Sequence, residues 1–394
     1  MMTLKIIFWT ALLIVFYTYI GYGILLYFII RLKRLLKGTP LPAAMPADED
    51  PPTMTLMICA YNEEDVVKEK MANTLALDYP KDKLRIMWVT DGSNDHTNEL
   101  LAAYPEVDIV FSPERRGKTA ALKHGLRELK TRYVAFTDAN TMINSGALRE
   151  IARLFSDPTV GCVSGEKRVA ARKAGEMAAE GEGLYWRYES MLKRWDSELY
   201  STMGAAGELY AMDPRLCREV PDEALLDDFM MSMYVVQAGK RIAYTTDAFA
   251  REYGSANIFE ESKRKRRIAA GGLQSIWWLR SMLNPLRQPL VTFQYVSHRV
   301  LRWSVTPVAM VLLLLVNIAL VAMRAGTVYT VMLILQTLFY LMALAGWLMN
   351  RYGYKNKLLY TAYYFVFMNF NVFRGMAYLR THGKSGAWEK AKRS

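Results

Sequence analysis

Acidic and small polar residues follow three short apolar segments in the middle of the chain. They occur in AYNEE (60–64), TDGSNDHT (90–97) and TDANT (137–141). One such segment alone indicates little, because Asp and Asn are common in ordinary turns. Three of them in register at strand ends of one sheet favour a shared acidic pocket. In TDANT the amide of Asn140 follows Asp138 where a second carboxylate would bind a metal more strongly.

Two further segments carry charged residues at predicted helix starts. ERRGKTAALKHGL (114–126) places Lys118 where an ammonium group and a helix N-terminus can both meet a diphosphate. LLDDF (225–229) places Asp227 and Asp228 before an apolar helix, although such a pair is also an ordinary N-terminal charge pair. No G-x-G-x-x-G follows the first strand and no Walker lysine motif occurs, so neither dinucleotide nor P-loop chemistry is indicated.

Short apolar strands alternate with amphipathic helices through this region. The predicted strands are TLMICAY, LRIMWVT, VDIVF, YVAFT and VGCVSG, and the predicted helices span 66–75, 94–103, 118–129 and 145–155. Ser145 is the expected N-cap of the last helix. The pattern implies an α/β fold with a mostly parallel sheet covered on both faces. Ligands of such sheets bind at the carboxyl ends of the strands, where the acidic motifs lie.

Apolar segments at both ends of the chain indicate membrane helices. Residues 6–30 are uncharged and long enough to cross a bilayer, and RLKRLLK (31–37) after them predicts a cytoplasmic continuation. A cleaved signal peptide is the alternative, but the apolar core of a signal peptide is about half as long as residues 6–30. Residues 305–323 and 327–349 are two further spans. Residues 358–379 are a candidate fourth span, although they contain Asn369, Asn371 and Arg374. Counted from an outside amino terminus, four crossings would place the tail outside, whereas its basic charge predicts the inside. One span is therefore re-entrant, interfacial or miscounted.

The net charge of +12 comes mostly from basic runs at 31–37, 263–267 and 384–393. We attribute these runs to attraction toward anionic lipid headgroups. Nucleic-acid binding is not expected, because no aromatic-plus-basic recognition motif accompanies them. The three cysteines are isolated, which fits a reducing cytoplasm, and the four scattered histidines give little support to a His-based metal site.

Taken in order, the motifs resemble those of the membrane-embedded family-2 glycosyltransferases, which include cellulose, hyaluronan and poly-N-acetylglucosamine synthases. The resemblance covers roughly residues 54–275. It implies a GT-A-like α/β catalytic domain that uses a UDP-sugar and Mg²⁺ or Mn²⁺ and inverts the anomeric configuration.

The resemblance also implies roles for single residues. Tyr61, Glu63 and Asp91 would contact the nucleotide, Lys118 the diphosphate, and Asp138 with Asn140 the metal ion. Asp228 would be the general base, with Asp227 as the preceding acidic residue. Gly204, Gly207 and Glu208 of GAAGELYAMDP would shape the acceptor pocket.

One motif departs from the family pattern. Where the polymer synthases have Gln-x-x-Arg-Trp, this chain has Arg264 at the glutamine position, keeps Arg267, and has Ile268 at the tryptophan position. Both arginines would contact the donor diphosphate. Isoleucine offers no flat face on which an acceptor sugar could stack, so the change disfavours processive synthesis of a long polymer.

The predicted organisation follows from these features. It comprises a transmembrane helix (1–31), a basic segment and Pro-rich linker (32–53), a cytoplasmic catalytic domain (54–254), interfacial amphipathic helices (255–304), a transmembrane region of two or three spans (305–379) and a basic tail (380–394). The expected function is extension of a β-linked polysaccharide at the inner membrane, with single-sugar transfer to a lipid as the first alternative. A non-catalytic membrane scaffold is the second, and intact Asp91, Asp138 and Asp228 argue against it. The sequence does not predict an oligomeric state.

Overall fold

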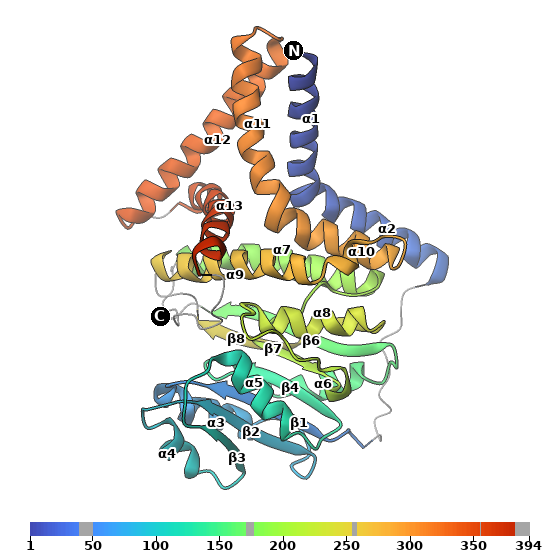
Figure 1. The fold of residues 1–394 in the computed structure, drawn as a ribbon, viewed down its shortest axis with the longest axis vertical. Helices are drawn as coiled ribbons and strands as arrows, with labels where there is room; N and C mark the ends of the chain where they lie inside the picture. Colours follow the sequence, from blue (N-terminus) through green and yellow to red (C-terminus); the bar gives the residue numbers. More distant parts are fainter. Residues whose placement is uncertain (39–49, 171–176, 254–257, 355, 383–394) are drawn as a thin grey trace.

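The computed structural model describes residues 1–38, 50–170, 177–253, 258–354 and 356–382. A sheet with its covering helices forms one end of the molecule, a layer of flat-lying helices follows, and apolar helices rise from that layer (Figure 1). Most of the predicted Pro-rich linker and basic tail lies outside the described residues.

One eight-stranded sheet forms the core of the catalytic region, in the order β3-β2-β1-β4-β7-β6-β8-β5. Its strands are β1 (Met54–Ala60), β2 (Leu84–Asp91), β3 (Val107–Ser112), β4 (Tyr133–Asp138), β5 (Met142–Ile143), β6 (Val160–Ala170), β7 (Leu209–Met212) and β8 (Arg241–Tyr253). Four strand pairings are parallel and three are antiparallel. The sheet is therefore mixed. The sequence did not reveal this, because β7 is short and enters between β4 and β6 from a loop.

Alternating side chains of the central strands point to opposite faces of the sheet, as the pleat requires. Leu56 and Ile58 of β1 belong to one hydrophobic cluster, with Val67 of α3 (Glu64–Leu75). Met57 of β1 belongs to the other, with Leu122 of α5 (Lys118–Arg127). Both faces are thus covered, and the near-continuous apolar character of the strands follows from that.

Two predicted helix starts are wrong. The helix expected over 94–103 is α4 (Thr97–Ala102), because Asp95 accepts hydrogen bonds from the backbone N–H groups of Glu64 and Thr97 and so holds the preceding loop. The helix expected from Ser145 is α6 (Ala147–Leu154), whose N-cap is Gly146. The carbonyl of Ser145 instead accepts a hydrogen bond from Asp78, so this residue lies before the helix and does not cap it.

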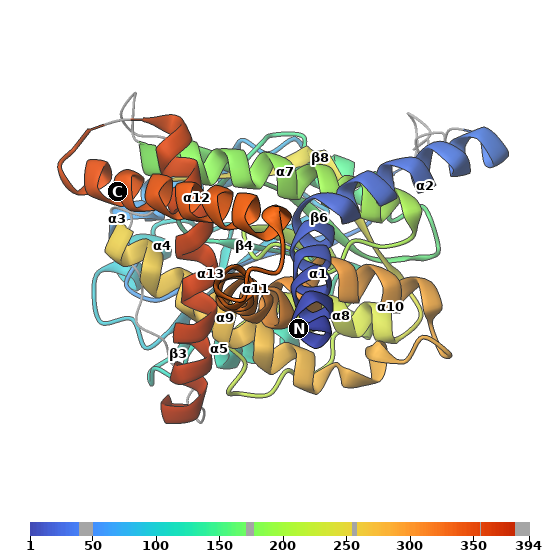
Figure 2. The same ribbon diagram turned by 90° about the horizontal axis from the view of Figure 1, so that it is seen from above.

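A layer of helices lies flat between the sheet and the apolar helices (Figure 1). It contains α7 (Met177–Leu199), α9 (Ile258–Trp278) and α10 (Pro289–Tyr295), and α8 (Asp227–Gln237) lies below it against the sheet. Two short 3₁₀ helices also occur in the chain: η2 (Pro214–Leu216) follows β7, and η3 (Arg280–Leu283) follows α9. The helix α13 (Lys357–His382) lies across the top of the layer in both views (Figures 1 and 2).

Three described helices are long and apolar enough to cross a membrane: Met2–Lys37, Pro289–Ala322 and Thr327–Arg351. The first contains α1 (Met2–Phe16), the π-helix η1 (Tyr17–Gly21) and α2 (Tyr22–Lys37), and it bends so that only α1 stands upright (Figure 1). The second contains α10, η4 (Val296–Val305) and α11 (Thr306–Ala322), and the third is α12 (Thr327–Arg351). These apolar helices make the protein membrane-associated. The segment 358–379, left open by the sequence, belongs to α13 and is not among the three.

Buried charged groups join α7 to the membrane helices. Asp196 of α7 accepts hydrogen bonds from the Tyr22 hydroxyl and the Gln294 amide, and its carboxylate lies 2.5 Å from Nδ1 of His298. Four side-chain groups from α7, α2, α10 and η4 therefore meet at one point. Because a buried charge is costly without partners, this contact fixes how the membrane helices sit on the catalytic region.

Candidate active site

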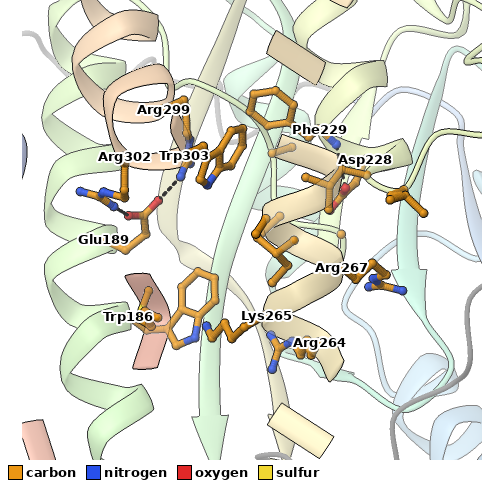
Figure 3. Close-up of a pocket in the computed structure, with 18 of the residues that line it drawn as sticks. Trp186, Glu189, Asp228, Phe229, Arg264, Lys265, Arg267, Arg299, Arg302 and Trp303 are labelled. Carbon is orange, nitrogen blue, oxygen red and sulfur yellow. Dashed lines mark hydrogen bonds and ion pairs between the residues drawn. The ribbon is translucent and has the colours of Figure 1, made fainter. Parts of the chain in front are cut away.

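A cavity of about 440 Å³ lies between the sheet and the helical layer. It is lined by side chains from most of the predicted motifs, and Figure 3 shows part of it. The predicted site residues that line it are Lys118, Asp138, Gly207, Glu208, Asp227, Asp228, Arg264 and Arg267. The cavity also reaches the membrane helices, through side chains of η1 and η4, and it reaches α13 as well.

Strand register places the acidic motifs side by side. Cys59 of β1 pairs with Asp138 of β4, and the next residue, Ala60, pairs with Thr90 of β2. The chain runs outward from β1 to β2 and β3 and then returns to place β4 on the other side of β1. Open α/β sheets bind ligands at the carboxyl ends of the strands where the strand order reverses in this way. Asp138 accepts a hydrogen bond of 2.7 Å from Nζ of Lys118, the first residue of α5. Burial acts to lower the pKa of Lys118, but the carboxylates of Asp138 and Asp227 raise it well above its usual range.

Asp91 holds the loop that carries Lys118. Its carboxylate accepts hydrogen bonds from the backbone N–H groups of Arg116 (3.0 Å) and Gly117 (2.6 Å). Gly92 has a φ of +66°, and a Cβ there would lie 2.5 Å from the backbone nitrogen of Arg115. Asp91 does not line the main cavity, and what it does in this structure is hold the loop that leads to Lys118.

Tyr61 and Glu63 also lie outside the main cavity. The Arg115 guanidinium lies over the Tyr61 ring at 3.9 Å from its centroid. Glu63 is the N-cap residue of α3, and its backbone N–H donates to Thr97 Oγ1. Tyr61 thus contacts the loop held by Asp91, whereas Glu63 contacts the start of α4.

Asp228 lies at the start of α8 and is a weaker acid than an ordinary aspartate. Burial and the neighbouring carboxylate of Asp227 raise the pKa of Asp228 to about 6. Its Oδ1 accepts a hydrogen bond from the Phe229 N–H, while a Cβ on Gly207 would lie 2.7 Å from its Oδ2. Oδ2 of Asp227 is buried and accepts no hydrogen bond within the described residues. Two carboxylates at one helix start, one of them weakly acidic, are suited to proton transfer.

The predicted acceptor residues do not all reach the cavity. Gly207 and Glu208 line it, but Gly204 does not. Gly204 has a φ of +91°, and a Cβ there would lie 2.2 Å from the ring of Phe229, so it permits close packing behind the site. Burial acts to raise the pKa of Glu208, but Lys167 (2.5 Å) and Arg264 (3.8 Å) hold it well below its usual range.

The basic run 263–267 does not form a lipid-facing patch, which corrects the expectation from charge alone. Arg264 lies 3.8 Å from Glu208 and 3.8 Å from Glu261. Lys265 lies 3.4 Å from Glu261, and Lys263 lies 3.2 Å from Glu260. These cations are neutralised inside the protein because α9 lies on the catalytic region and contributes to the cavity.

Sequence reasoning missed a buried lysine beneath the TDANT loop. Lys70 of α3 is fully buried and donates to Thr137 Oγ1 (3.1 Å) and to the carbonyl of Thr141 (2.6 Å). Burial lowers the pKa of Lys70 to about 7. Nothing in the local sequence distinguished it from a solvent-exposed helical lysine.

Sequence reasoning also missed the residues of α7 and η4 that line the cavity. These are Trp186, Tyr188, Glu189, Lys193, Arg299, Arg302 and Trp303. Glu189 lies 2.7 Å from Arg299 and 2.8 Å from Arg302. Burial acts to raise the pKa of Glu189, but Arg299 and His298 hold it well below its usual range. The available signal was the spacing of charged residues, four between Glu189 and Lys193 and three between Arg299 and Arg302.

The donor set suits a hard divalent cation that is shared with a substrate. No three His, Cys, Asp or Glu side chains cluster as a metal site in the described part of the chain. Asp138 offers a carboxylate to the cavity, whereas Asn140 does not line it. Mg²⁺ is commonly held by one or two carboxylates together with substrate phosphates, so a single carboxylate fits that mode.

Residues 51–271, more than half of the chain, match the family described as glycosyltransferase like family 2. The chain belongs to this family. This family-2 glycosyltransferase is 35% identical over 120 residues to a poly-beta-1,6-N-acetyl-D-glucosamine synthase of Staphylococcus aureus, which is 29% of each chain. It is 25% identical over 259 residues to a beta-monoglucosyldiacylglycerol synthase of Synechocystis sp., which is 61% of this chain and 53% of that protein. Neither alignment spans two thirds of the relative.

A solved structure matches nearly the whole glycosyltransferase. The mannosyltransferase PcManGT from Pyrobaculum calidifontis, in complex with GDP-Man and Mn²⁺, superposes with a TM-score of 0.68 at 23% identity, covering 96% of this chain and 99% of that one. This likeness confirms the fold, a GT-A-like α/β region with apolar helices at both ends.

Proposed function

We propose that this glycosyltransferase transfers one sugar, with inversion, from a UDP-sugar to a hydroxyl group of a membrane-held lipid acceptor. The observation that carries the proposal is the convergence of Lys118, Asp138 and Asp228 in one cavity that also reaches the membrane helices. The first two suit the donor diphosphate, and the third suits the acceptor.

Asp228 acts as the general base. An inverting transfer needs one carboxylate that removes the proton from the acceptor hydroxyl while its oxygen attacks the anomeric carbon. The new C–O bond forms on the face opposite the nucleoside diphosphate, which leaves with the electron pair of the broken bond. A pKa of about 6 makes Asp228 a stronger base than an ordinary carboxylate while it is still ionised at neutral pH.

Lys118, Arg264 and Arg267 stabilise the departing diphosphate. Lys118 places its ammonium group beside the start of α5, where the helix dipole adds further positive potential. A divalent cation would be held by Asp138, with the Asn140 carbonyl as a second oxygen after movement of the loop. When bound, such an ion would neutralise negative charge on the leaving diphosphate.

Tyr61, Glu63 and Asp91 are assigned to the donor nucleotide. Tyr61 supplies a flat ring, and Glu63 a carboxylate that can accept from a base N–H. The structural neighbour was captured with GDP-Man, so guanine nucleotides are the alternative donors to compare.

The lipid acceptor is favoured over a growing polysaccharide by the far end of the cavity. Phe365, Met368 and Val372 of α13 line that end, which suits an acyl or prenyl chain. Ile268 also lines the cavity, where the polymer synthases have a stacking tryptophan. Polysaccharide extension is the second candidate, supported by the name of the Staphylococcus aureus relative.

A panel assay tests the reaction. Purified protein receives UDP- and GDP-sugars with Mg²⁺ or Mn²⁺, and nucleotide release and product size are measured. Release of UDP with a lipid-soluble product supports the proposal, and a high-molecular-weight product supports polysaccharide extension. No nucleotide release from any donor would support the non-catalytic scaffold.

A further inference from the structure

The cavity has a positively charged end away from the catalytic carboxylates. Glu189 and Lys193 of α7 line it together with Arg299 and Arg302 of η4. Both arginines pair with Glu189, and Figure 3 shows this group across the view from Asp228. Glu189 pairs with both arginines, and the carboxylates of Glu208 and Asp228 also act on Lys193. Lys193 is left without an ion pair among the described residues, so this part of the cavity favours an anion.

Lys193 has no hydrogen-bond or ion-pair partner among the residues that the structure describes. Its side chain lines the cavity, and the residue is only 5% exposed. Its ammonium lies 5.8 Å from the centroid of the Tyr244 ring, and no residue in the described ranges forms a hydrogen bond or an ion pair with it. Burial, and then the charge of Arg299, lower the pKa of Lys193 to about 8. A buried ammonium group is costly without a partner, so a bound anion would stabilise it.

Apolar side chains border this charged end. Phe365, Met368 and Val372 occupy one face of α13, and Tyr19 of η1 and Trp303 of η4 complete the border. The Tyr19 hydroxyl donates to Asn369 at 2.6 Å, which ties η1 to α13 beside the cavity. An anionic group at Lys193 would therefore have room for a hydrocarbon chain next to it.

We propose that this end of the cavity binds the phosphate of a lipid acceptor, with Lys193 as a direct ligand and the lipid chain along α13. The proposal rests on the proposed function and names its acceptor class: a lipid whose headgroup carries both a phosphate and a hydroxyl. When the lipid phosphate binds Lys193, the hydroxyl group of the same headgroup points toward Asp228. An uncharged saccharide would leave Lys193 unpaired.

Lipid binding to the full chain in detergent tests the proposal without turnover. Native mass spectrometry compares phosphatidylglycerol with a neutral glucosyl diacylglycerol, using wild type, Lys193→Ala, Lys193→Arg and Arg194→Ala. We expect wild type to bind phosphatidylglycerol at least tenfold more tightly than the neutral lipid, because hydrogen bonds to charged groups are strong. Lys193→Ala should lose that preference and Lys193→Arg should keep it. Arg194 is exposed on the same helix, so Arg194→Ala should match wild type.

Each other result overturns the inference. Equal binding of the two lipids, or an unchanged preference in Lys193→Ala, would remove Lys193 as a phosphate ligand. Displacement of phosphatidylglycerol by an equal concentration of inorganic phosphate would assign the site to free phosphate. A fall in melting temperature for Lys193→Ala would indicate a structural role, since removal of an unpaired buried charge should leave stability unchanged or raise it.

Failure of the proposed function would look different. Asp228→Asn should bind phosphatidylglycerol as wild type does while losing transfer. Absence of nucleotide release from every donor would reject the reaction without changing the lipid-binding result.

Discussion

At the scale of single residues, Asp228 combines burial, a neighbouring carboxylate and a place at the cavity wall. Together these raise its pKa to about 6, so the residue is mostly ionised at pH 7 and protonated in mild acid. A base must be ionised to accept a proton. We expect kcat/KM to rise with pH up to about 6 and then to level off, and a pH–rate profile measures this.

The Asp228→Asn variant should lose transfer by a factor of about 10² to 10⁴, the range of general acid–base catalysis. The amide keeps the size of the side chain but cannot take the proton. Nucleotide release and donor binding are measured together. Wild-type activity in Asp228→Asn, or loss of donor binding with the same variant, would contradict the assignment as base.

Asp138 and Asn140 give a paired test of the metal position. We expect Asp138→Ala to abolish transfer, because the cavity then loses its carboxylate beside Lys118. Asn140→Asp should be tolerated and should lower the Mn²⁺ concentration needed for half-maximal activity, since a charged oxygen binds a hard cation better. An inactive Asn140→Asp variant, in an enzyme whose activity resists chelators, would rule out the metal assignment.

At the scale of elements, the loop before β7 sets the position of Asp228. A Cβ on Gly207 would lie 2.7 Å from Oδ2 of Asp228, closer than any ordinary contact. Gly207→Ala should therefore push the carboxylate aside and lower transfer by about 10²-fold, as expected for a displaced catalytic group. Gly146→Ala is the control, because no atom lies within 4 Å of a Cβ there. Equal activity of the two variants would contradict the close approach.

The contact between α7 and the membrane helices makes a prediction about stability. Asp196→Ala removes a buried carboxylate from Tyr22, Gln294 and His298, and should cost about 3–5 kcal/mol of unfolding free energy. Arg34→Ala removes a partly exposed ion pair with Glu198, which lies on α7 as Asp196 does. This variant should lose less than about 1 kcal/mol of unfolding free energy. Thermal unfolding in detergent compares the two variants. Similar melting temperatures would show that the junction does not depend on Asp196.

At the scale of the whole molecule, we propose three membrane crossings, which would remove the conflict between span count and tail charge. The basic run 31–37 at the end of α2 predicts a cytoplasmic catalytic region, and α11 and α12 would then leave and return. The helix α13 lies across the top of the helical layer and is not one of the three helices, so no fourth crossing is expected (Figure 1).

Cysteine labelling of cells with an impermeant maleimide tests this arrangement. Met323→Cys, between α11 and α12, should react in intact spheroplasts, whereas Ser394→Cys should react only after permeabilisation. Cys162 is buried, and the parent protein gives the background from all three native cysteines. Labelling of Ser394→Cys in intact spheroplasts would require a fourth crossing.

The sequence alone determined the strand-end motifs, because local polarity after an apolar strand is enough to mark a turn at the sheet edge. It therefore predicted Asp91 and Asp138. Asp227 and Asp228 were visible only as a charge pair at a helix start, and family resemblance supplied the roles of all four. Only the tertiary structure decided where the basic run 263–267 lies, because its position depends on the packing of α9 against distant acidic residues. The same holds for Lys193 and Arg299, which are far apart in sequence and meet because α7 and η4 pack together. Local sequence specifies which groups can react, and long-range packing specifies which of them share a cavity.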